Sequence, residues 1–433
     1  MGFHLFKSDR CLKIDGHKEE TINKPLVTFE PDFVYIRAVD RGLNPLVGLP
    51  SVGDKVKRGT LLGKDERDSF PSYSPVSGEV ASHENVFLAD GHSYDCLKIK
   101  NDKEGTWETQ TKFKSAEEAT KEEILAHIKD SGIIGFGGAG FPTYRKYQLK
   151  ADADCLIINA VECEPYLTSD YLLGISNMEK VFKIIPYLLK LSGAKKVYFA
   201  VKKDRPLLIE EAEATAASHP DIPFEVRALP DRYPMGYERN IVREIVHKEY
   251  DMLPIEAGAI VNNLSTYIGL GEYFSEGKVP VIKSITVSGE VHDPKTVLTP
   301  YGVLSDDLIN FCGGAKNEKY KVICGGPMCG NAMDSSFALL LQGNGLVVMD
   351  NIQTLGDPCW HCGECCSQCP MDLQPVQIQM ALVSNDLERM IALDADKCVG
   401  CGLCSYVCPS RIDVTQNVLK AKALVIKAKK ERK

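Results

Sequence analysis

Two cysteine-rich stretches decide how this chain is interpreted: CWHCGECCSQCP at residues 359–370 and CVGCGLCSYVCP at residues 398–409. Both stretches have the spacing C-x2-C-x2-C-x3-C-P. The cysteines that match it are Cys359, Cys362, Cys365, Cys369, Cys398, Cys401, Cys404 and Cys408. Two complete matches, each ending in proline, predict two metal-binding loops of one kind.

This spacing is that of bacterial ferredoxins, where three close thiolates hold one [4Fe–4S] cube and the fourth cysteine reaches the other cube. By that rule, one cluster is held by Cys359, Cys362, Cys365 and Cys408, and the other by Cys398, Cys401, Cys404 and Cys369. Zinc sites favour paired C-x2-C knuckles, and disulfides need an oxidising compartment that nothing else in the sequence suggests. We therefore predict two [4Fe–4S] clusters.

The composition is that of an ordinary, mildly acidic soluble protein. The 433 residues include 51 Lys and Arg against 59 Asp and Glu, a net charge of −8, and their length allows three or four domains. An acidic balance argues against broad nucleic-acid binding, which depends on basic side chains. The first twenty residues contain no apolar signal region, and no stretch approaches 18 uncharged apolar residues. We expect a cytoplasmic protein without a transmembrane segment.

Residues 1–112 are predicted to form short strands between turns. The stretches SVGDKVKRG at 51–59 and SPVSGEV at 74–80 look like the barrel-sandwich fold of biotinyl and lipoyl domains. Those domains carry a cofactor on a lysine at a hairpin tip, and the turn at 76–79 has no lysine. This part is therefore interpreted as a structural or docking module.

A glycine-rich stretch, GIIGFGGAGFPTYRK, occupies residues 132–146, after a polar linker in which Ser115-Ala-Glu-Glu predicts a helix start. Glycines let backbone N–H groups approach an anionic ligand, and a helix that follows such a loop favours phosphate. The stretch lacks both the usual dinucleotide setting and the ending of a P-loop. Taken alone, it is a weak signal.

The apolar run CLIINA at 155–160 predicts a buried parallel strand that ends in VECEPY at 161–166. Ligands in open α/β sheets bind at such carboxyl ends, and the carboxylates and Asn159 there can accept from sugar hydroxyls or from flavin or nicotinamide N–H groups. A helix at 178–192, a strand at 196–201 and a helix near 237–248 complete an α/β layer structure.

The stretches GFGGAGFPTYRK (135–146), NAVECEPY (159–166) and GAIVNNLST (258–266), followed by the two cysteine runs, resemble the RnfC family. Its members are the NADH-oxidising subunits of Rnf complexes and soluble relatives in proline reductase, cobalamin reductase and methylenetetrahydrofolate reductase systems. The first three stretches also look like the flavin-carrying subunit of respiratory complex I. The resemblance implies oxidation of NADH by FMN and transfer of single electrons through the two clusters to a partner protein in a multisubunit complex.

The resemblance also implies particular cofactor-binding residues. Those implied as FMN ligands in the glycine-rich loop are Gly137, Gly138, Gly140 and Lys146. Those implied beside the isoalloxazine and NADH are Asn159, Glu162 and Glu164, and those implied to close over the FMN phosphate are Asn262, Asn263 and Thr266. Phe141 matches an aromatic position near the dinucleotide. Gly236 and Glu238 match a Tyr-Pro-x-Gly-Gly-Glu stretch, in which Tyr237 replaces a glycine and is expected to narrow the nicotinamide pocket or stack on a ring.

The implied architecture is multidomain α/β. It comprises a barrel-sandwich domain at 1–112, a Rossmann-like flavin domain at 113–276, an SLBB-like β-grasp insert at 277–349 and a helical ferredoxin at 350–433. Within the insert a helix is expected near Ser305, and Cys312, Cys324 and Cys329 are interpreted as buried small hydrophobes. Helical periodicity at 374–391 suits the ferredoxin, and the spacing favours Cys365 over its neighbour Cys366 as ligand.

Other interpretations remain open from the sequence. Residues 9–13, DRCLK, stand where RnfC proteins of Rnf complexes commonly have Gly-Gly-Val/Ile-His, which favours a soluble paralogue. One alternative is a peripheral subunit of a membrane ion-translocating NADH:ferredoxin oxidoreductase, on the cytoplasmic face. Another is a non-enzymatic iron–sulfur relay that receives electrons from a partner flavoprotein. The sequence leaves open the final acceptor and the choice between NADH and NADPH.

Overall fold

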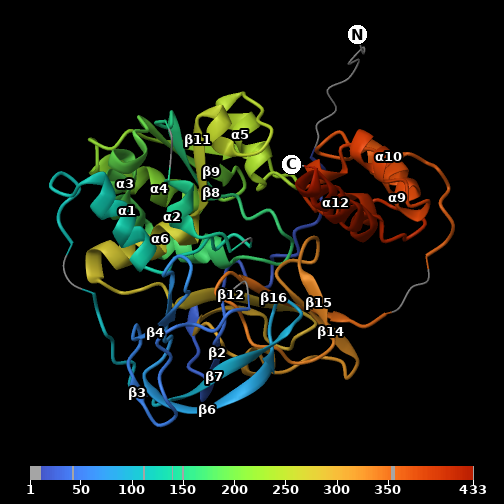
Figure 1. Cartoon of the computed structure of the whole chain (residues 1–433). Helices are drawn as coiled ribbons and strands as arrows, with labels where there is room; N and C mark the ends of the chain where they lie inside the picture. The colour runs from blue at the N-terminus through green and yellow to red at the C-terminus, as the bar shows by residue number, and fades with distance from the viewer. Residues whose placement is uncertain are drawn as a thin grey trace.

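The computed structural model describes residues 11–40, 43–110, 113–138, 140–148, 151–352 and 356–432. An α/β domain lies above two β-rich parts, and a small helical domain lies beside it (Figure 1). This is the expected multidomain α/β architecture. Asp9 and Arg10, which belong to the departure noted at the amino terminus, lie outside the described residues.

The N-terminal part is a half-barrel of two antiparallel sheets. Its strands are β2 (Phe33–Arg37), β3 (Lys55–Val56), β4 (Leu61–Lys64), β5 (Pro71–Tyr73), β6 (Gly78–Phe87) and β7 (Ser93–Asn101). One sheet has the order β2-β7-β6-β3, and β4 pairs with β5. Alternate residues of β2 and β7, including Val34, Ile36, Leu97 and Ile99, are buried between the sheets, as the period of two predicts.

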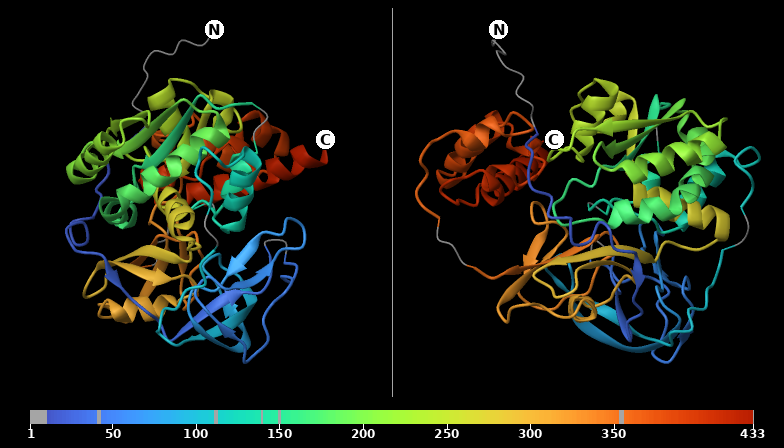
Figure 2. Two further views of the ribbon diagram at one scale, coloured as in Figure 1. Left: turned by 90° about the vertical axis from the view of Figure 1, so that its left-hand side faces the viewer. Right: turned by 180° about the vertical axis from the view of Figure 1, so that it is seen from behind.

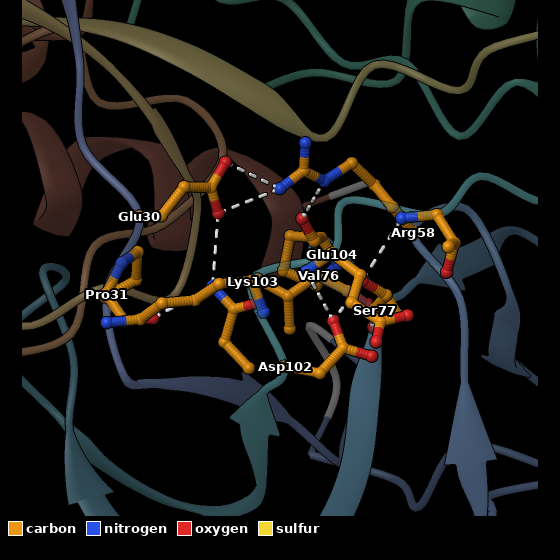
Figure 3. A network of polar contacts seen from close by, with 12 residues as sticks. Glu30, Pro31, Arg58, Val76, Ser77, Asp102, Lys103 and Glu104 are labelled. Carbon is orange, nitrogen blue, oxygen red and sulfur yellow. Dashed lines mark hydrogen bonds and ion pairs between the residues drawn. The ribbon is translucent and has the colours of Figure 1, made fainter.

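A polar network holds the turn before β6 against the chain that follows β7 (Figure 3). The Arg58 guanidinium donates to both carboxylate oxygens of Glu30, at 2.8 and 2.9 Å, and to the Pro75 carbonyl at 2.9 Å. Ser77 donates to Asp102 at 2.6 Å. The turn predicted at a hairpin tip is therefore buried and internally bonded, which agrees with a structural role for this part.

The α/β domain is built on a parallel sheet of order β10-β9-β8-β11. Its elements are α1 (Lys121–Asp130), α2 (Thr143–Lys146), β8 (Cys155–Ala160), α3 (Ser169–Ser192), β9 (Lys196–Lys202), α4 (Pro206–Ser218), β10 (Phe224–Leu229), α5 (Glu238–Val246), β11 (Ala259–Asn263) and α6 (Leu264–Glu276). Strand β8 lies inside the sheet, and Leu156, Ile157 and Ile158 are fully buried, which confirms the strand predicted from CLIINA.

Two helix starts differ from the sequence expectation. Helix α1 begins at Lys121, where Thr120 and Glu123 form a reciprocal capping box. Ser115 makes a similar pair of bonds with Glu118, but these close only a turn before the helix. Helix α3 begins at Ser169, nine residues before the predicted Met178, because its first turn is capped by a carboxylate described below.

The SLBB-like part is a sheet of order β1-β13-β12-β16-β14-β15. Its elements are β12 (Ile282–Gly289), β13 (Lys295–Pro300), α7 (Ser305–Phe311), β14 (Tyr320–Cys324), β15 (Asn331–Met333) and β16 (Gly345–Asp350). The helix expected near Ser305 is present. Strand β1 (Val27–Thr28) pairs in parallel with β13 at the sheet edge, although it lies in the sequence range assigned to the N-terminal domain.

The C-terminal domain is helical. Its elements are α8 (Glu364–Ser367), α9 (Pro375–Val383), α10 (Leu387–Ala392), α11 (Leu403–Tyr406) and α12 (Val414–Glu431). The predicted helical stretch at 374–391 is two helices, because Asn385 adopts a positive φ of 54° between them. Helices α9, α10 and α12 enclose a small apolar core that includes Ile378 and Val418.

The N-terminal segment connects these parts. In the view from behind, it descends between the helical domain and the α/β domain (Figure 2). Leu12 and Tyr233 exchange two backbone hydrogen bonds of 2.7 Å there. The junction between the two domains is thus lined by a third segment of the chain.

Candidate functional site: two thiol cavities and a glycine-rich loop

The helical domain contains two cavities, each lined by four of the predicted cysteine ligands. The inner thiol cavity is lined by Cys369, Cys398, Cys401 and Cys404. The outer thiol cavity is lined by Cys359, Cys362, Cys365 and Cys408. Each cavity therefore takes three cysteines from one run and the fourth from the other run, which is the grouping predicted from the ferredoxin spacing.

The thiols surround these cavities instead of converging on one point. Among the residues that the structure describes, no three His, Cys, Asp or Glu side chains are placed to hold a single metal ion. Backbone N–H groups approach the sulfurs, from His361 to Cys359 and from Gly400 to Cys398, both at 3.4 Å. Four thiols around a cavity, with N–H donors nearby, fit a four-iron cube held at its corners.

Burial differs between the two cavities. Cys401 is only 8% exposed, and burial raises the pKa of the Cys369 thiol to about 11. Cys362 is exposed, and the neighbouring Trp360 is 65% exposed. Cys365 lines the outer cavity, whereas Cys366 is absent from its lining and lies 4.0 Å away, sulfur to sulfur.

The glycine-rich loop lies over the start of α6. The Phe136 N–H donates to the Thr266 hydroxyl at 3.2 Å. A Cβ added at Gly137 would lie 3.3 Å from the Asn263 side chain, and Gly138 has φ +115° with open space where a Cβ would point. Asn263 caps α6, because its side chain accepts from the Ser265 N–H. The structure thus brings the predicted loop and the predicted Asn-Asn turn together.

Several groups around this loop are ready to accept a polar ligand. The side-chain amide oxygen of Asn262 (Oδ1) and the Thr143 hydroxyl are buried and have no hydrogen-bond partner among the described residues. Buried polar atoms without partners are costly, so a ligand that reached them would relieve that cost. The open glycine loop and these atoms fit a flavin mononucleotide.

Other predicted residues are bonded to one another at the same strand ends. Lys146 donates to Glu238 at 2.9 Å and to the Val261 carbonyl at 2.7 Å. Asn159 donates to the Gly236 carbonyl at 2.8 Å. Of the remaining predicted residues, Phe141 is 42% exposed and Gly140 has φ +57°.

Glu162 has a structural contact that the sequence did not indicate. Its carboxylate accepts from the Asp170 N–H at 2.8 Å and from the Ser169 hydroxyl at 3.0 Å, so it caps α3. The backbone carbonyl of Glu162 accepts from Lys18 of the N-terminal segment at 2.7 Å. Burial lowers the pKa of Lys18 to about 8, against the opposing effect of the Glu162 charge.

Glu164 lies at the junction of three parts of the chain. Its carboxylate accepts from the Met328 N–H at 3.2 Å, from the Cys329 thiol at 2.6 Å and from the Tyr233 hydroxyl at 3.0 Å. The Tyr233 hydroxyl also lies 2.6 Å from the Cys401 carbonyl, in the loop of the inner thiol cavity. This side of the α/β domain therefore contacts the inner cavity directly.

Sequence reasoning missed the roles of Tyr233 and Cys329. Cys312 is buried as expected, and Cys324 is partly buried. Cys329 is exposed, and its thiol donates to Glu164. The interpretation of Cys329 as a buried small hydrophobe is therefore wrong. Nothing in the local sequence places Cys329 beside Glu164, because the two residues come from different domains. Asp170 and Lys283, which lie beside the glycine-rich loop, were also missed.

Comparison with known proteins finds three domain models that match parts of the chain. The model of the Nuo51 FMN-binding domain matches residues 128–271, the SLBB domain matches residues 284–332, and the 4Fe-4S dicluster domain matches residues 358–412.

Two curated relatives cover most of the chain. The C subunit of the proton-translocating ferredoxin:NAD(+) oxidoreductase complex of Clostridium ljungdahlii is 31% identical over 381 residues, which are 84% of this chain and 82% of the relative. Its counterpart in the Na(+)-translocating complex of Acetobacterium woodii is 31% identical, over 83% of this chain and 84% of the relative. A solved NAD+-reducing [NiFe]-hydrogenase in the air-oxidised state shares the fold, with a TM-score of 0.51 and 19% identity over 72% of this chain and 64% of that chain.

Proposed function

Because the chain belongs to the RnfC family, whose members are subunits of ion-translocating ferredoxin:NAD+ oxidoreductase complexes, we propose that it oxidises NADH and delivers single electrons to a partner. The α/β domain is an FMN-binding domain and the C-terminal domain is a dicluster ferredoxin domain. FMN, when bound, supplies the exchange between a hydride pair and single electrons that iron–sulfur clusters require.

The observation that carries this proposal is the contact between the α/β domain and the inner thiol cavity. Tyr233 follows the sheet of the α/β domain and lies against the Cys401 carbonyl. The outer thiol cavity has the exposed Cys362 and Trp360 at its edge. The inner cluster is thus the entry from the flavin side, and the outer cluster is the exit toward the partner.

In this proposal, the chain's own residues position the cofactor. The glycine-rich loop offers N–H groups beside the α6 start, and Asn262, Asn263 and Thr266 surround the same place. Asn159 lies near the end of β8, and Glu162 and Glu164 follow this strand, at the carboxyl end of the sheet where α/β folds bind ligands. These residues bind and orient the cofactor, and no side chain acts as a general acid or base.

The ligands of the clusters follow from the cavity linings. We assign Cys369, Cys398, Cys401 and Cys404 to the inner cluster. We assign Cys359, Cys362, Cys365 and Cys408 to the outer cluster. Iron binds the thiolate form, so cluster assembly must remove the proton of Cys369, although burial raises the pKa of this thiol to about 11.

The partner is another subunit of the same complex. The relatives named above are complex subunits, which favours the peripheral membrane-complex interpretation over a soluble paralogue. No helix within the described ranges is both long and apolar enough to cross a bilayer. Membrane association would therefore depend on partners, and co-purification with integral subunits from solubilised membranes tests it.

The central experiment is anaerobic reduction of the purified protein. We expect bound FMN, about eight irons per chain for two cubes, bleaching of the flavin absorbance by NADH, and an EPR signal from a reduced cluster. Dithionite serves as the control reductant. If dithionite bleaches the flavin and NADH does not, the oxidation of NADH is excluded. If no flavin is present, the relay interpretation replaces the proposal.

A further inference from the structure

Lys283 is a buried lysine of the SLBB-like part whose ammonium group lacks a polar partner. It lies at the start of β12 and is only 4% exposed. Within the described part of the chain, its Nζ has no hydrogen bond and no ion pair within 4.0 Å. A buried cation without acceptors is unfavourable unless an anion approaches it.

The ammonium group points toward the glycine-rich loop of the neighbouring domain. Nζ lies 3.9 Å from the ring centroid of Phe136, within that loop. The charge of Asp170 opposes the lowering of the Lys283 pKa by burial. Asp170 is itself directed at the start of α6, because it accepts from Asn263 Nδ2 at 2.6 Å and Ser265 Oγ at 2.5 Å. Lys283 therefore lies beside the loop and the helix start that are proposed to hold the FMN phosphate.

The basic residues of the loop itself are already engaged. Arg145 pairs with Asp68, and Lys146 pairs with Glu238 and the Val261 carbonyl. The N-terminus of the 13-residue helix α6 favours an anion but carries only a partial positive charge. Lys283 is thus the basic side chain in this region that has no hydrogen bond or ion pair within the described residues.

We propose that Lys283 binds the phosphate of the flavin and makes the site select FMN over riboflavin. The inference rests on the proposed function. It assigns part of the flavin site to the SLBB-like part, so the two domains must be docked for the cofactor to be held tightly. A phosphate also satisfies an ammonium group better than Asp170, which is occupied by two hydrogen bonds.

The test is the affinity of the flavin-free full-length protein for FMN and for riboflavin, measured by quenching of flavin fluorescence. Lys283→Met removes the charge at similar volume. We expect FMN to bind roughly 10- to 100-fold more weakly, as for loss of a charge-assisted hydrogen bond. Riboflavin lacks the phosphate, so its affinity should change by less than about 2-fold. The preference of the wild-type protein for FMN would then nearly disappear.

Lys295→Met is a matched control. Lys295 belongs to the same sheet and also lies over a phenylalanine ring, 5.0 Å from the Phe311 centroid, but it pairs with Asp293. This variant should keep the wild-type preference. Lys283→Gln is a second uncharged variant, which should lose the preference as Lys283→Met does.

The outcomes separate this inference from the proposed function. Equal losses for FMN and riboflavin, or loss of riboflavin binding in both Lys283 variants, would show that the lysine only supports the structure and would overturn the inference. Unchanged FMN affinity would also overturn it. If the wild-type protein binds neither flavin, the proposed function and the inference fail together.

Discussion

The inner and outer thiol cavities have the same sequence spacing but different surroundings. Each run has a glycine after its second cysteine, and both glycines have nearly the same backbone conformation, φ +80° at Gly363 and +79° at Gly402. A Cβ at Gly402 would lie 2.2 Å from the Met328 carbonyl oxygen, whereas a Cβ at Gly363 would meet nothing within 4 Å. At this glycine the inner loop packs on the rest of the chain, and the outer loop does not.

A repeated motif therefore carries the same chemistry twice, but the two copies occupy different positions in the molecule. The spacing predicts two equivalent clusters, and it contains no information about which one receives electrons first. The proposed order is based on contacts of the inner loop with Tyr233, Glu164 and Met328, which come from other domains. Substitutions in the two loops and at their junction with the other domains can test this order.

Replacing one ligand in each cavity should separate entry from exit. Cys401→Ser should lower NADH-driven electron delivery by more than about 100-fold. Loss of a hydrogen-bond partner of a metal ligand already lowers activity by about 10- to 100-fold, and loss of the ligand itself should lower it further. Cys362→Ser should abolish delivery to the partner while NADH still reduces the inner cluster. EPR after addition of NADH distinguishes them. If NADH reduces the remaining cluster of Cys401→Ser as fast as that of Cys362→Ser, the proposed order is wrong.

Adding one methyl group at Gly363 or at Gly402 tests how closely each loop packs against the rest of the chain. Gly363→Ala should lower the free energy of unfolding by about 1–2 kcal/mol, the cost of a side chain at positive φ. Gly402→Ala meets the same cost and also the Met328 carbonyl, so we expect about 3 kcal/mol or more. Anaerobic thermal unfolding measures both. Equal losses would mean that the inner loop does not pack against Met328 in solution.

Removing one hydroxyl should weaken the junction moderately. Tyr233→Phe leaves the buried Cys401 carbonyl and the Glu164 carboxyl without this partner, at a cost of about 1–3 kcal/mol in the free energy of unfolding. Tyr187→Phe is the control, because its hydroxyl donates to the Lys114 carbonyl at an exposed site, and we expect less than about 0.5 kcal/mol. A Tyr233→Phe protein as stable as the control would contradict a bonded junction.

The raised pKa of Glu164 should make the stability of the protein depend on pH. Burial raises the pKa of Glu164 above its ordinary value of 4.5, and hydrogen bonds from Cys329, Met328 and Tyr233 only partly oppose the shift. A carboxyl group with a raised pKa favours the folded state when protonated, so this stability is present below pH 4.5 and is lost as the pH rises through the folded pKa. Glu164→Gln should remove this dependence. Unfolding midpoints measured from about pH 5 upward test it, and parallel curves for both proteins would exclude the effect.

The smallest effect is expected at the fifth thiol. Cys366→Ser should leave the iron content and the EPR spectrum unchanged, because Cys366 does not line the outer cavity, whereas Cys365→Ser should lose the outer cluster. Iron analysis of the two proteins decides the register. Loss of iron in Cys366→Ser alone would reverse the assignment of these neighbours.

Much of the fold could be predicted where a local pattern has one physical solution. The run CLIINA is apolar throughout, and a strand buried on both faces is its stable form, as β8 shows. Boundaries were less predictable. The pattern at Ser115 closes only a turn. Helix α3 starts earlier than predicted because Glu162, which lies well before the predicted start of that helix, caps its first turn. Asn385 interrupts a periodic stretch that the apolar spacing alone makes continuous.

The chemistry of this protein can be recognised from its amino-acid sequence. Eight cysteines at fixed spacing and a glycine-rich loop are local signals, because a cluster loop and a loop over an anion need particular residues close together in the chain. Which cavity faces the flavin domain, and which lysine approaches the loop, became visible only in the folded chain. Lys283, Tyr233 and Met328 act on groups more than a hundred residues away in the chain, and such contacts depend on how separate domains pack.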